Sequence, residues 1–333
     1  MTQLLEVDGL VVEMRRHRVA FRAVNDVSFS LERGGALAIV GESGCGKSLT
    51  LRAIMGLLPN DGRLVSGRVI VDGTTLATST RGRGRGHNQR TRMSIVFQDP
   101  LSALNPVATV GNQIAEAPRH VLGLSRSASR ARALELLRLV EIPDPERRYH
   151  AYPHELSGGT RQRVMIAIAL SSDPAILLCD EPTTALDVTI QTQILALLAE
   201  LRSERGLSLV FVTHDLTVVS QVAERLAVMY AGRLVETGPT AEVLAAPRHP
   251  YTAGLLAAAV DVDTPESEPL SIPGSLPDPL RLPSGCTFHP RCSFATPECV
   301  TADLHLEPVA ADRQAACLHS DELATMRAGA SRG

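Results

Sequence analysis

One short segment restricts the possible folds of this chain more than any other. Residues 41–48 read Gly-Glu-Ser-Gly-Cys-Gly-Lys-Ser. The apolar run Ala36–Val40 before it predicts a buried strand, and the pattern after it predicts a helix through Leu58. A strand, a glycine loop and a helix in this order are typical of α/β proteins that bind phosphate groups, because the glycines let backbone N–H groups approach the anion.

The residues of this loop predict direct contacts with a nucleotide. Lys47 is expected to reach the β- and γ-phosphates, and the hydroxyl of Ser48 is expected to bind Mg²⁺. The predicted ATP-binding residues are Gly41, Ser43, Gly44, Cys45, Gly46, Lys47, Ser48 and Leu49.

A second apolar run supplies the acidic groups that hydrolysis needs. Ala175–Cys179 predicts another buried strand, which ends at Asp180 and Glu181. A carboxylate at the end of a strand beside a phosphate loop can hold Mg²⁺, and the next carboxylate can polarise the attacking water. These residues predict an ATPase.

The segment Leu156–Arg163 reads LSGGTRQR and predicts a second anion site. A helix is expected to begin at Ser157, where a hydroxyl and glycine amides would be exposed, and such a helix start attracts anions. The phosphate loop already serves one nucleotide. The second site is therefore expected to face a nucleotide that is bound to another subunit.

Taken together, these motifs resemble those of the ABC ATPases over about residues 5–245. The resemblance implies an α/β P-loop NTPase core with an antiparallel β subdomain and an inserted helical subdomain. It makes Gln98 the Q-loop glutamine, which contacts Mg²⁺ and the attacking water, and it makes His214 the switch residue at the γ-phosphate. Ala185–Asp187 resembles the D-loop at the dimer interface, and the usual adenine-stacking position falls near Arg18, with His17 and Phe21 close by.

The same resemblance implies a complete set of site residues. The catalytic residues are Glu181, His214 and Gln98, and Mg²⁺ is held by Ser48, Gln98 and Asp180. The residues that act in trans on the ATP of a second subunit are Ser157, Gly158, Gly159 and Gln162.

Two further segments resemble one branch of this family. Asp99–Pro106 reads DPLSALNP and His249–Thr252 reads HPYT, as in the ATPase subunits of oligopeptide and dipeptide importers. The expected domains are an ATPase core at 1–98 and 156–245, a helical subdomain at 99–155, and a small C-terminal extension at 246–333.

Four cysteines gather in that extension. Cys286, Cys292, Cys299 and Cys317 follow the spacing C-x₅-C-x₆-C-x₁₇-C. Four thiolates suit an iron–sulfur cluster or a structural zinc, and disulfides are disfavoured in a reducing cytoplasm. The resemblance implies a [4Fe–4S] cluster; zinc, with His289 or His319 as further ligands, and unligated thiols are the alternatives.

Charge and hydropathy exclude several classes of protein. A formal net charge of −3 disfavours nucleic-acid binding, and the basic run Arg81–Arg92 is interpreted as a solvated loop because it has no interleaved aromatic residues. No apolar run reaches the roughly 20 residues that span a bilayer, and the first residues lack the features of a secretory signal. The chain is expected at the cytoplasmic face of the inner membrane, attached through its partners.

The partners follow from the importer resemblance. They are a second ABC ATPase, preferably a paralogue rather than a second copy, two transmembrane permease subunits and an extracytoplasmic substrate-binding protein. The expected function is ATP-driven uptake of di- and oligopeptides. The alternatives are an importer of another small solute, such as a nickel chelate, and a soluble ABC ATPase outside transport; the second cassette or long coiled coil typical of the latter is not seen in the sequence.

Overall fold

The computed structural model describes residues 3–17, 19–78, 92–184, 186–260 and 272–323, which form two compact units. The first unit comprises the described parts of Gln3–Leu31, Ala36–Arg83 and Thr213–Gly333, and the second those of Glu32–Gly35 and Gly84–Val212. Three predictions therefore lie outside the described residues: Arg18, Ala185 and the basic run before Arg92.

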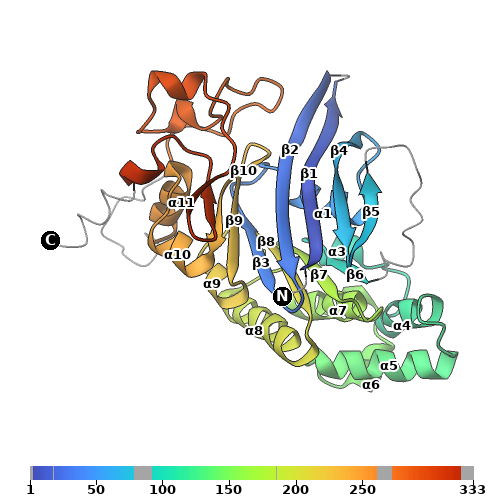
Figure 1. The fold of residues 1–333 in the computed structure, drawn as a ribbon. Coiled ribbons are helices and arrows are strands. Elements are labelled where there is room, and N and C mark those ends of the chain that lie inside the picture. The colour runs from blue at the N-terminus through green and yellow to red at the C-terminus, as the bar shows by residue number, and fades with distance from the viewer. Residues whose placement is uncertain (1–2, 18, 79–91, 185, 261–271, 324–333) are drawn as a thin grey trace. The chain divides into compact units, whose positions relative to one another are not determined.

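The first unit contains an antiparallel sheet with the strand order β2-β1-β4-β5, as Figure 1 shows. Its strands are β1 (Gln3–Arg16), β2 (Val19–Glu32), β4 (Gly62–Val71) and β5 (Thr74–Thr78). The turn between β4 and β5 consists of Asp72 and Gly73, with φ angles of 51° and 73°. Positive φ at both central residues suits a tight hairpin turn. The predicted antiparallel β subdomain is thus confirmed.

The same unit holds five strands of a second sheet, in the order β11-β12-β10-β9-β3. They are β3 (Ala36–Val40), β9 (Arg225–Tyr230), β10 (Arg233–Pro239), β11 (Glu307–Ala310) and β12 (Arg313–Ala315). β3 runs parallel to β9, whereas β9, β10, β12 and β11 pair antiparallel. Every residue of β3 is buried, as its apolar run predicts.

The helices of the first unit are short. They are α1 (Lys47–Met55), α9 (Val219–Val222), α10 (Thr240–Ala245), α11 (Pro250–Val260), and the 3₁₀ turns η3 (His289–Arg291) and η4 (Pro297–Val300). The helix predicted through Leu58 ends at Met55. The reason is Gly56, which adopts a left-handed conformation with φ 69° and closes the helix.

The second unit is built on three parallel strands, β6 (Met93–Val96), β7 (Ile176–Asp180) and β8 (Ser208–Thr213). β7 and β8 are buried throughout, as their apolar runs predict. The helices are α3 (Pro100–Ala103), α4 (Val110–His120), α5 (Arg126–Leu139), α6 (Pro145–Tyr149), η1 (Pro153–Glu155), α7 (Gly158–Leu170) and α8 (Val188–Arg205).

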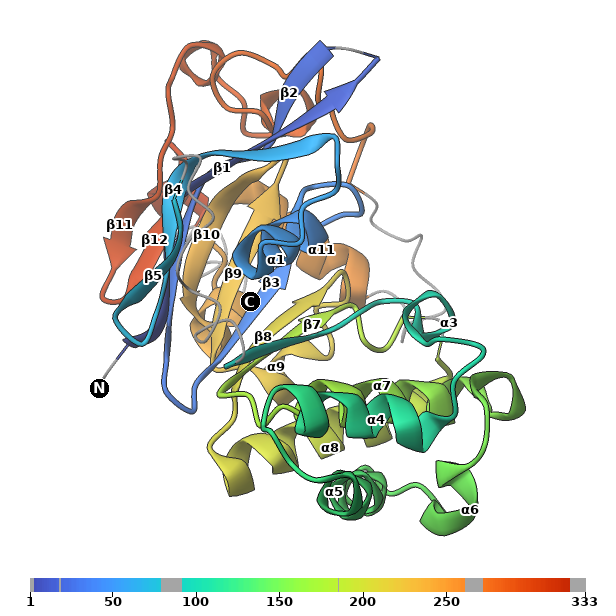
Figure 2. The same ribbon diagram turned by 90° about the vertical axis from the view of Figure 1, so that its right-hand side faces the viewer.

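Helices α4, α5 and α7 lie against one another, as Figure 2 shows. α5 begins where the hydroxyl of Ser125 accepts a hydrogen bond from the Ala128 N–H. Arg163 on α7 donates to the carbonyl of Val140, which joins the end of α5 to α7. Among the helices that the structure describes, none combines the length and apolar character that crossing a membrane requires.

Candidate ATP site

The phosphate loop connects β3 to α1 through positions that accept only glycine. Gly44 and Gly46 have φ angles of 84° and 110°, in a region that other residues rarely adopt. A Cβ atom at Gly46 would lie 2.7 Å from the carbonyl oxygen of Ala23, and one at Gly41 would lie 2.2 Å from that of Met229. The loop therefore packs against neighbouring backbone, and its conformation follows from its glycines.

Lys47 lies inside this loop. Its Nζ donates to the carbonyl oxygens of Gly41 and Glu42, at 2.6 and 3.0 Å, and the residue is only 4% exposed. Ser48 and Leu49 follow in the first turn of α1 and are half-buried. The first unit thus brings the loop residues together with a cation and the start of a helix, which is the arrangement expected of a phosphate site.

The remaining loop side chains differ in exposure. Ser43 and Gly44 face solvent, whereas Cys45 is buried, and burial raises the pKa of its thiol. The backbone carbonyl of Cys45 accepts a hydrogen bond from the N–H of Gly232 at 2.8 Å. Cys45 therefore contributes to the site through its backbone, while its side chain fills space.

In the second unit, β7 delivers two acidic residues to its carboxyl end. Asp180 is the last residue of the strand and is 2% exposed, and Glu181 follows it. Gln98 Nε2 donates to Glu181 Oε2 at 3.1 Å, and the Thr184 hydroxyl donates to the same oxygen at 2.9 Å. The two residues predicted to act on the attacking water, Gln98 and Glu181, are therefore in contact.

The backbone at Glu181 is unusual. Its φ angle of 46° lies in the left-handed region, and its N–H donates to the carbonyl of Val212 at the end of β8. A non-glycine residue is uncommon in this region. Together with the bonds from Gln98 and Thr184, this conformation fixes where the carboxylate points.

The LSGGTRQR segment forms the start of α7 as predicted. Ser157 is the N-cap residue, and its Oγ lies 3.4 Å from the Thr160 N–H and 2.8 Å from the Thr160 hydroxyl. Ser157 and Gly158 are exposed, and Gly159 packs against Ile190 so closely that an added Cβ would meet that side chain at 2.8 Å. This end of α7 presents a hydroxyl and helix N–H groups to the surface.

Gln162 differs from the other signature residues. It is 1% exposed, and its amide nitrogen has no hydrogen-bond partner in the described part of the chain. Its side chain lies inside its own unit, whereas Ser157 and Gly158 face outward. The predicted role of Gln162 on a second subunit's nucleotide thus lacks the exposure that Ser157 has.

His214 follows β8 directly and is exposed. The next residue, Asp215, accepts hydrogen bonds from the N–H and the hydroxyl of Thr217, which shapes the turn after the strand. His214 and the phosphate loop belong to the first unit, and Gln98 and Glu181 to the second. Of the D-loop residues, Asp187 caps α8 by accepting from the Ile190 N–H at 2.9 Å.

The HPYT segment packs beneath the phosphate loop. The hydroxyl of Tyr251 accepts a hydrogen bond from the N–H of Glu42 at 2.8 Å. His249 is fully enclosed, and burial lowers its pKa to about 3, so its neutral ring accepts from the Tyr251 N–H at 3.0 Å. The sequence of HPYT indicates only a family resemblance, and this contact with the loop is not predicted by it.

None of the six cysteines forms a disulfide. In the extension, burial raises the pKa of Cys286, Cys292 and Cys317, the last to about 12, and the neighbouring thiols act in the same direction. Cys299 Sγ lies 3.7 Å from His319 Nε2. Within the described ranges, however, no group of three or more His, Cys, Asp or Glu side chains is arranged to hold a metal ion. The predicted iron–sulfur or zinc centre is therefore not supported by the structure.

The described part of the chain also has hollows away from the ATP-site residues. A groove of about 1280 Å³ in the helical part of the second unit is lined by residues of α4, α5 and the segments beside them, among them Asn105, Arg119 and Arg130. Leu101 and Val107 in the same region are 61% and 82% exposed. Exposed apolar side chains beside a groove are typical of a protein-binding surface.

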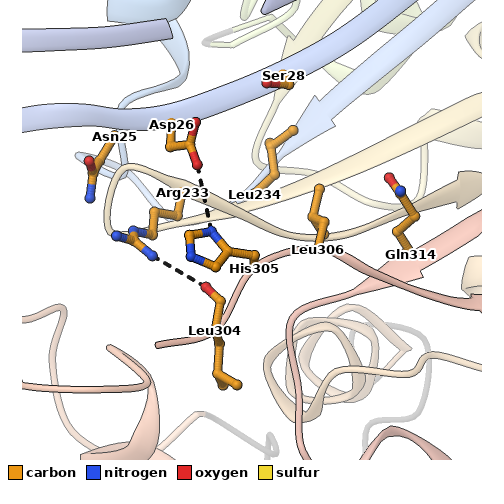
Figure 3. A pocket seen from close by; sticks show the side chains of 9 residues that line it. All are labelled: Asn25, Asp26, Ser28, Arg233, Leu234, Leu304, His305, Leu306 and Gln314. Carbon is orange, nitrogen blue, oxygen red and sulfur yellow. Dashed lines mark hydrogen bonds and ion pairs between the residues drawn. The ribbon is translucent and has the colours of Figure 1, made fainter. Parts of the chain in front are cut away.

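Another hollow, of about 240 Å³, lies in the first unit between β2, β10 and the segment 304–306. Figure 3 shows the ring of His305 directed at Asp26, 3.6 Å away, and the guanidinium of Arg233 directed at the carbonyl of Leu304, 3.2 Å away. None of the predicted site residues lines it. Its contacts attach the C-terminal extension to the strands of the first unit.

Two family descriptions match the chain. Residues 24–184 match the family described as ABC transporter, and residues 235–299 match the one described as oligopeptide/dipeptide transporter, C-terminal region. The first match contains the phosphate loop, Gln98, the signature and Glu181. The second contains HPYT and three of the four cysteines of the extension, Cys286, Cys292 and Cys299.

Several known proteins are similar along most of the chain. A putative peptide import ATP-binding protein of Brucella abortus is 49% identical over 300 residues, covering 89% of each chain. The dipeptide transport ATP-binding protein DppD of Escherichia coli is 44% identical over 94% of this chain and 96% of its own. The oligopeptide transport ATP-binding protein OppD of Mycobacterium tuberculosis is 47% identical over 99% of this chain and 54% of its own.

Solved structures of ABC proteins are also similar to this chain in fold. The ATP-binding cassette MJ0796, in a dimeric post-hydrolysis state bound to ADP and Pi, matches with a TM-score of 0.62 and 28% identity, covering 71% of this chain and 99% of its own. The cbiO1 protein of Clostridium perfringens, part of an ABC transporter complex, matches with a TM-score of 0.62 and 27% identity over 80% of this chain and 97% of its own.

Proposed function

This chain belongs to the ABC transporter family, in the branch with the oligopeptide/dipeptide transporter C-terminal region, and we propose how its residues drive peptide import. It is the ATP-hydrolysing subunit of a peptide importer. Di- and oligopeptides are the proposed cargo, which would pass through separate permease subunits. The observation that carries the proposal is the hydrogen bond from Gln98 to Glu181, because it fixes a carboxylate directly after the strand-end Asp180.

ATP binding falls to the phosphate loop. The loop N–H groups and the start of α1 face the phosphates, and Lys47 neutralises charge on the β- and γ-phosphates. The enclosed position of its Nζ, 2.6 Å from the Gly41 carbonyl, supports this role.

Glu181 promotes hydrolysis by polarising the attacking water. Hydrogen bonds from Gln98 and Thr184 hold the Glu181 carboxylate in place. Ser48, Gln98 and Asp180 offer the oxygen donors that Mg²⁺ prefers, and the ion would neutralise charge on the phosphates. His214 would sense the γ-phosphate from the turn after β8.

The start of α7 would complete the ATP site of a second ATPase subunit, for which a paralogue is the preferred partner. Ser157, Gly158 and Gly159 would contribute a hydroxyl and helix N–H groups to the γ-phosphate, and Gln162 would support them from inside the helix. The exposure of Ser157 and Gly158 supports this role.

The groove beside α4 and α5 is the proposed docking site for a permease subunit. Its size and the exposed side chains of Leu101 and Val107 suit a short helix of the partner. α3 begins directly after Asp99, one residue beyond Gln98, so a partner bound in this region would sense the state of the catalytic carboxylate. The chain would therefore lie at the cytoplasmic face of the inner membrane, with two permeases and a substrate-binding protein completing the importer.

Uptake by proteoliposomes that contain the importer tests this function. With ATP on the side of this chain, the wild-type complex should accumulate labelled di- or tripeptides, and Glu181→Gln should abolish uptake. Glu204→Gln makes the same chemical change at an exposed position of α8 and should leave uptake intact. Uptake of a nickel chelate in place of peptides would move the chain to the other importer class. ATP hydrolysis with no accumulated solute would favour a soluble ABC ATPase.

For the four cysteines we propose a [4Fe–4S] cluster, with structural zinc as the alternative. The proposal rests on their spacing and on the hydrogen bond from the Cys286 N–H to the Cys299 carbonyl, 2.9 Å long, which brings two of the four residues together. Iron, sulfide and zinc would be measured in protein purified without oxygen. Four iron and four sulfide per chain are expected; the absence of all three elements would refute both centres.

A further inference from the structure

Arg291 of the C-terminal extension contacts the phosphate loop. Arg291 ends the turn η3, directly before Cys292, and its guanidinium binds both carboxylate oxygens of Glu42. The two N···O distances are 2.8 and 3.0 Å. Glu42 is the second residue of the phosphate loop, and 249 positions separate the two partners in sequence. Both residues belong to the first unit.

The ion pair between Arg291 and Glu42 is largely shielded from water. The Arg291 side chain is 6% exposed and that of Glu42 29%, so water screens the pair much less than it screens a surface pair. Arg291 also donates from Nε to the carbonyl of Pro273 at 2.8 Å. The bonds to Glu42 raise the pKa of Arg291, which keeps the guanidinium charged. A planar guanidinium held at one edge by the extension therefore presents its other edge to the loop.

A second contact holds the backbone of the same loop residue. The Tyr251 hydroxyl accepts the Glu42 N–H at 2.8 Å, so both the side chain and the backbone amide of Glu42 are occupied by groups outside the loop. Tyr251, Tyr230 and Phe288 form an aromatic cluster with ring centroids 4.6 to 5.4 Å apart. Phe288 precedes η3, so this cluster fixes the segment that carries Arg291.

We propose that Arg291 is a positioning residue for ATP binding: through Glu42 it holds the phosphate loop in the shape that receives the phosphates. This inference rests on the proposed role of the loop. Lys47 Nζ binds the carbonyls of Gly41 and Glu42, so a shift of Glu42 displaces the lysine as well as the loop backbone. The C-terminal extension thereby sets the ATP affinity of the chain.

The loop binds phosphates in the ground state and in the transition state alike. Loss of the pair should therefore raise KM for ATP while kcat changes little. Coupling between two sites typically amounts to about 5- to 150-fold in affinity, so Arg291→Gln should weaken MgATP binding by about 5-fold or more. Arg291→Lys keeps the charge but loses the fork that serves two carboxylate oxygens, so its affinity should fall between those of the wild type and Arg291→Gln.

The experiment measures equilibrium binding of MgATP and steady-state hydrolysis by the full-length chain and its variants. Glu42→Gln and the double variant with Arg291→Gln complete a mutant cycle. If the two residues act through each other, the double variant should lose no more affinity than the weaker-binding single variant. Arg225→Gln is the control, because it removes another ion pair of the extension, to Asp312, away from the loop residues.

Wild-type affinity in folded Arg291→Gln and Arg291→Lys would overturn the proposal, as would losses that simply add in the double variant. An equal loss in Arg225→Gln would also overturn it, because general loosening of the extension would then explain the effect. If Arg291→Gln fails to fold, Glu42→Gln and Arg291→Lys decide the question alone. Failure of the wild-type chain to bind MgATP, or unchanged binding in Lys47→Ala, would instead refute the phosphate-loop assignment itself.

Discussion

Breaking the buried ion pair between Arg313 on β12 and Glu236 on β10 should destabilise the chain more at pH 8 than at pH 5. The side chains are 5% and 0% exposed, and Arg313 donates to Glu236 Oε1 at 2.9 Å. Glu236 also accepts from the N–H groups of Arg248 and His249, at 2.8 and 3.0 Å. Arg313→Met keeps most of the arginine stem but leaves the carboxylate without its cation.

Burial of Glu236 determines the direction in which stability changes with pH. Burial raises the pKa of Glu236 above its ordinary value, although the bonds from Arg248 and Arg313 oppose this. As pH falls, the Glu236 carboxylate is therefore protonated at a higher pH in the folded chain than in the unfolded chain. Its contribution to stability is lost as pH rises through the raised pKa. Removing Arg313 takes away one of the opposing causes and raises the pKa further, so the variant's folded state should be protonated over a wider pH range.

The loss of stability expected for Arg313→Met amounts to a few kcal/mol when Glu236 is ionised. Removing one partner of a buried ion pair costs about 3–5 kcal/mol when the other stays ionised. At pH 8 this corresponds to a decrease in Tm of about 6–20 °C for a domain of about 150–250 residues. At pH 5 the decrease should be clearly smaller, because Glu236 takes up a proton and no longer carries a buried, unpaired charge.

Thermal unfolding followed by circular dichroism at pH 5 and pH 8 tests this prediction. Arg68→Met is the matched control, because Arg68 forms an exposed pair with Asp8 whose side chains are 60% and 55% exposed. The control should change Tm little at either pH. Equal decreases in Tm at the two pH values for Arg313→Met, or no decrease at pH 8, would show that an unpaired charge on Glu236 does not destabilise the chain.

Two further predictions concern the ATP site. Gly46→Ala should abolish MgATP binding in a titration, because the added Cβ would lie 2.7 Å from the Ala23 carbonyl at a φ of 110°; retained binding would show that the loop can relax. Ser157→Ala should lower the free energy of unfolding by about 1 kcal/mol through loss of the α7 N-cap. It should also lower the steady-state ATPase rate of the assembled ATPase pair; an unchanged rate would argue against a role of this hydroxyl at the partner's nucleotide.

The parts of the fold that the sequence predicted are those whose signal is local. Ala36–Val40 and residues 176–179 are continuous apolar runs, and both are buried strands in the structure. Ser157 caps its helix as its side-chain chemistry predicts. The end of α1 was predicted three residues too late, because Gly56 adopts the left-handed conformation before the apolar pattern ends.

The contacts that the sequence did not predict join distant segments. Neither Glu42 nor Arg291 has an unusual local pattern, and their pairing depends on how the extension folds back on β9 and on the loop. The hydrogen bond between Tyr251 and Glu42 is equally non-local. Cysteine spacing likewise predicts ligand chemistry but does not set side-chain directions, and the described thiols do not form a metal-holding group.

We infer that this chain binds ATP with its own phosphate loop and completes the ATP site of a second subunit with the start of α7. The most direct test is the mass of the Glu181→Gln chain, alone and with its paired ATPase subunit, measured by light scattering with and without MgATP. Slowed hydrolysis should trap a closed pair, so the mass should rise to that of two ATPase subunits with MgATP and should fall again when Ser157→Arg is added. A chain that binds MgATP but keeps the mass of a single subunit, alone and with its partner, would show that the start of α7 does not complete a second ATP site.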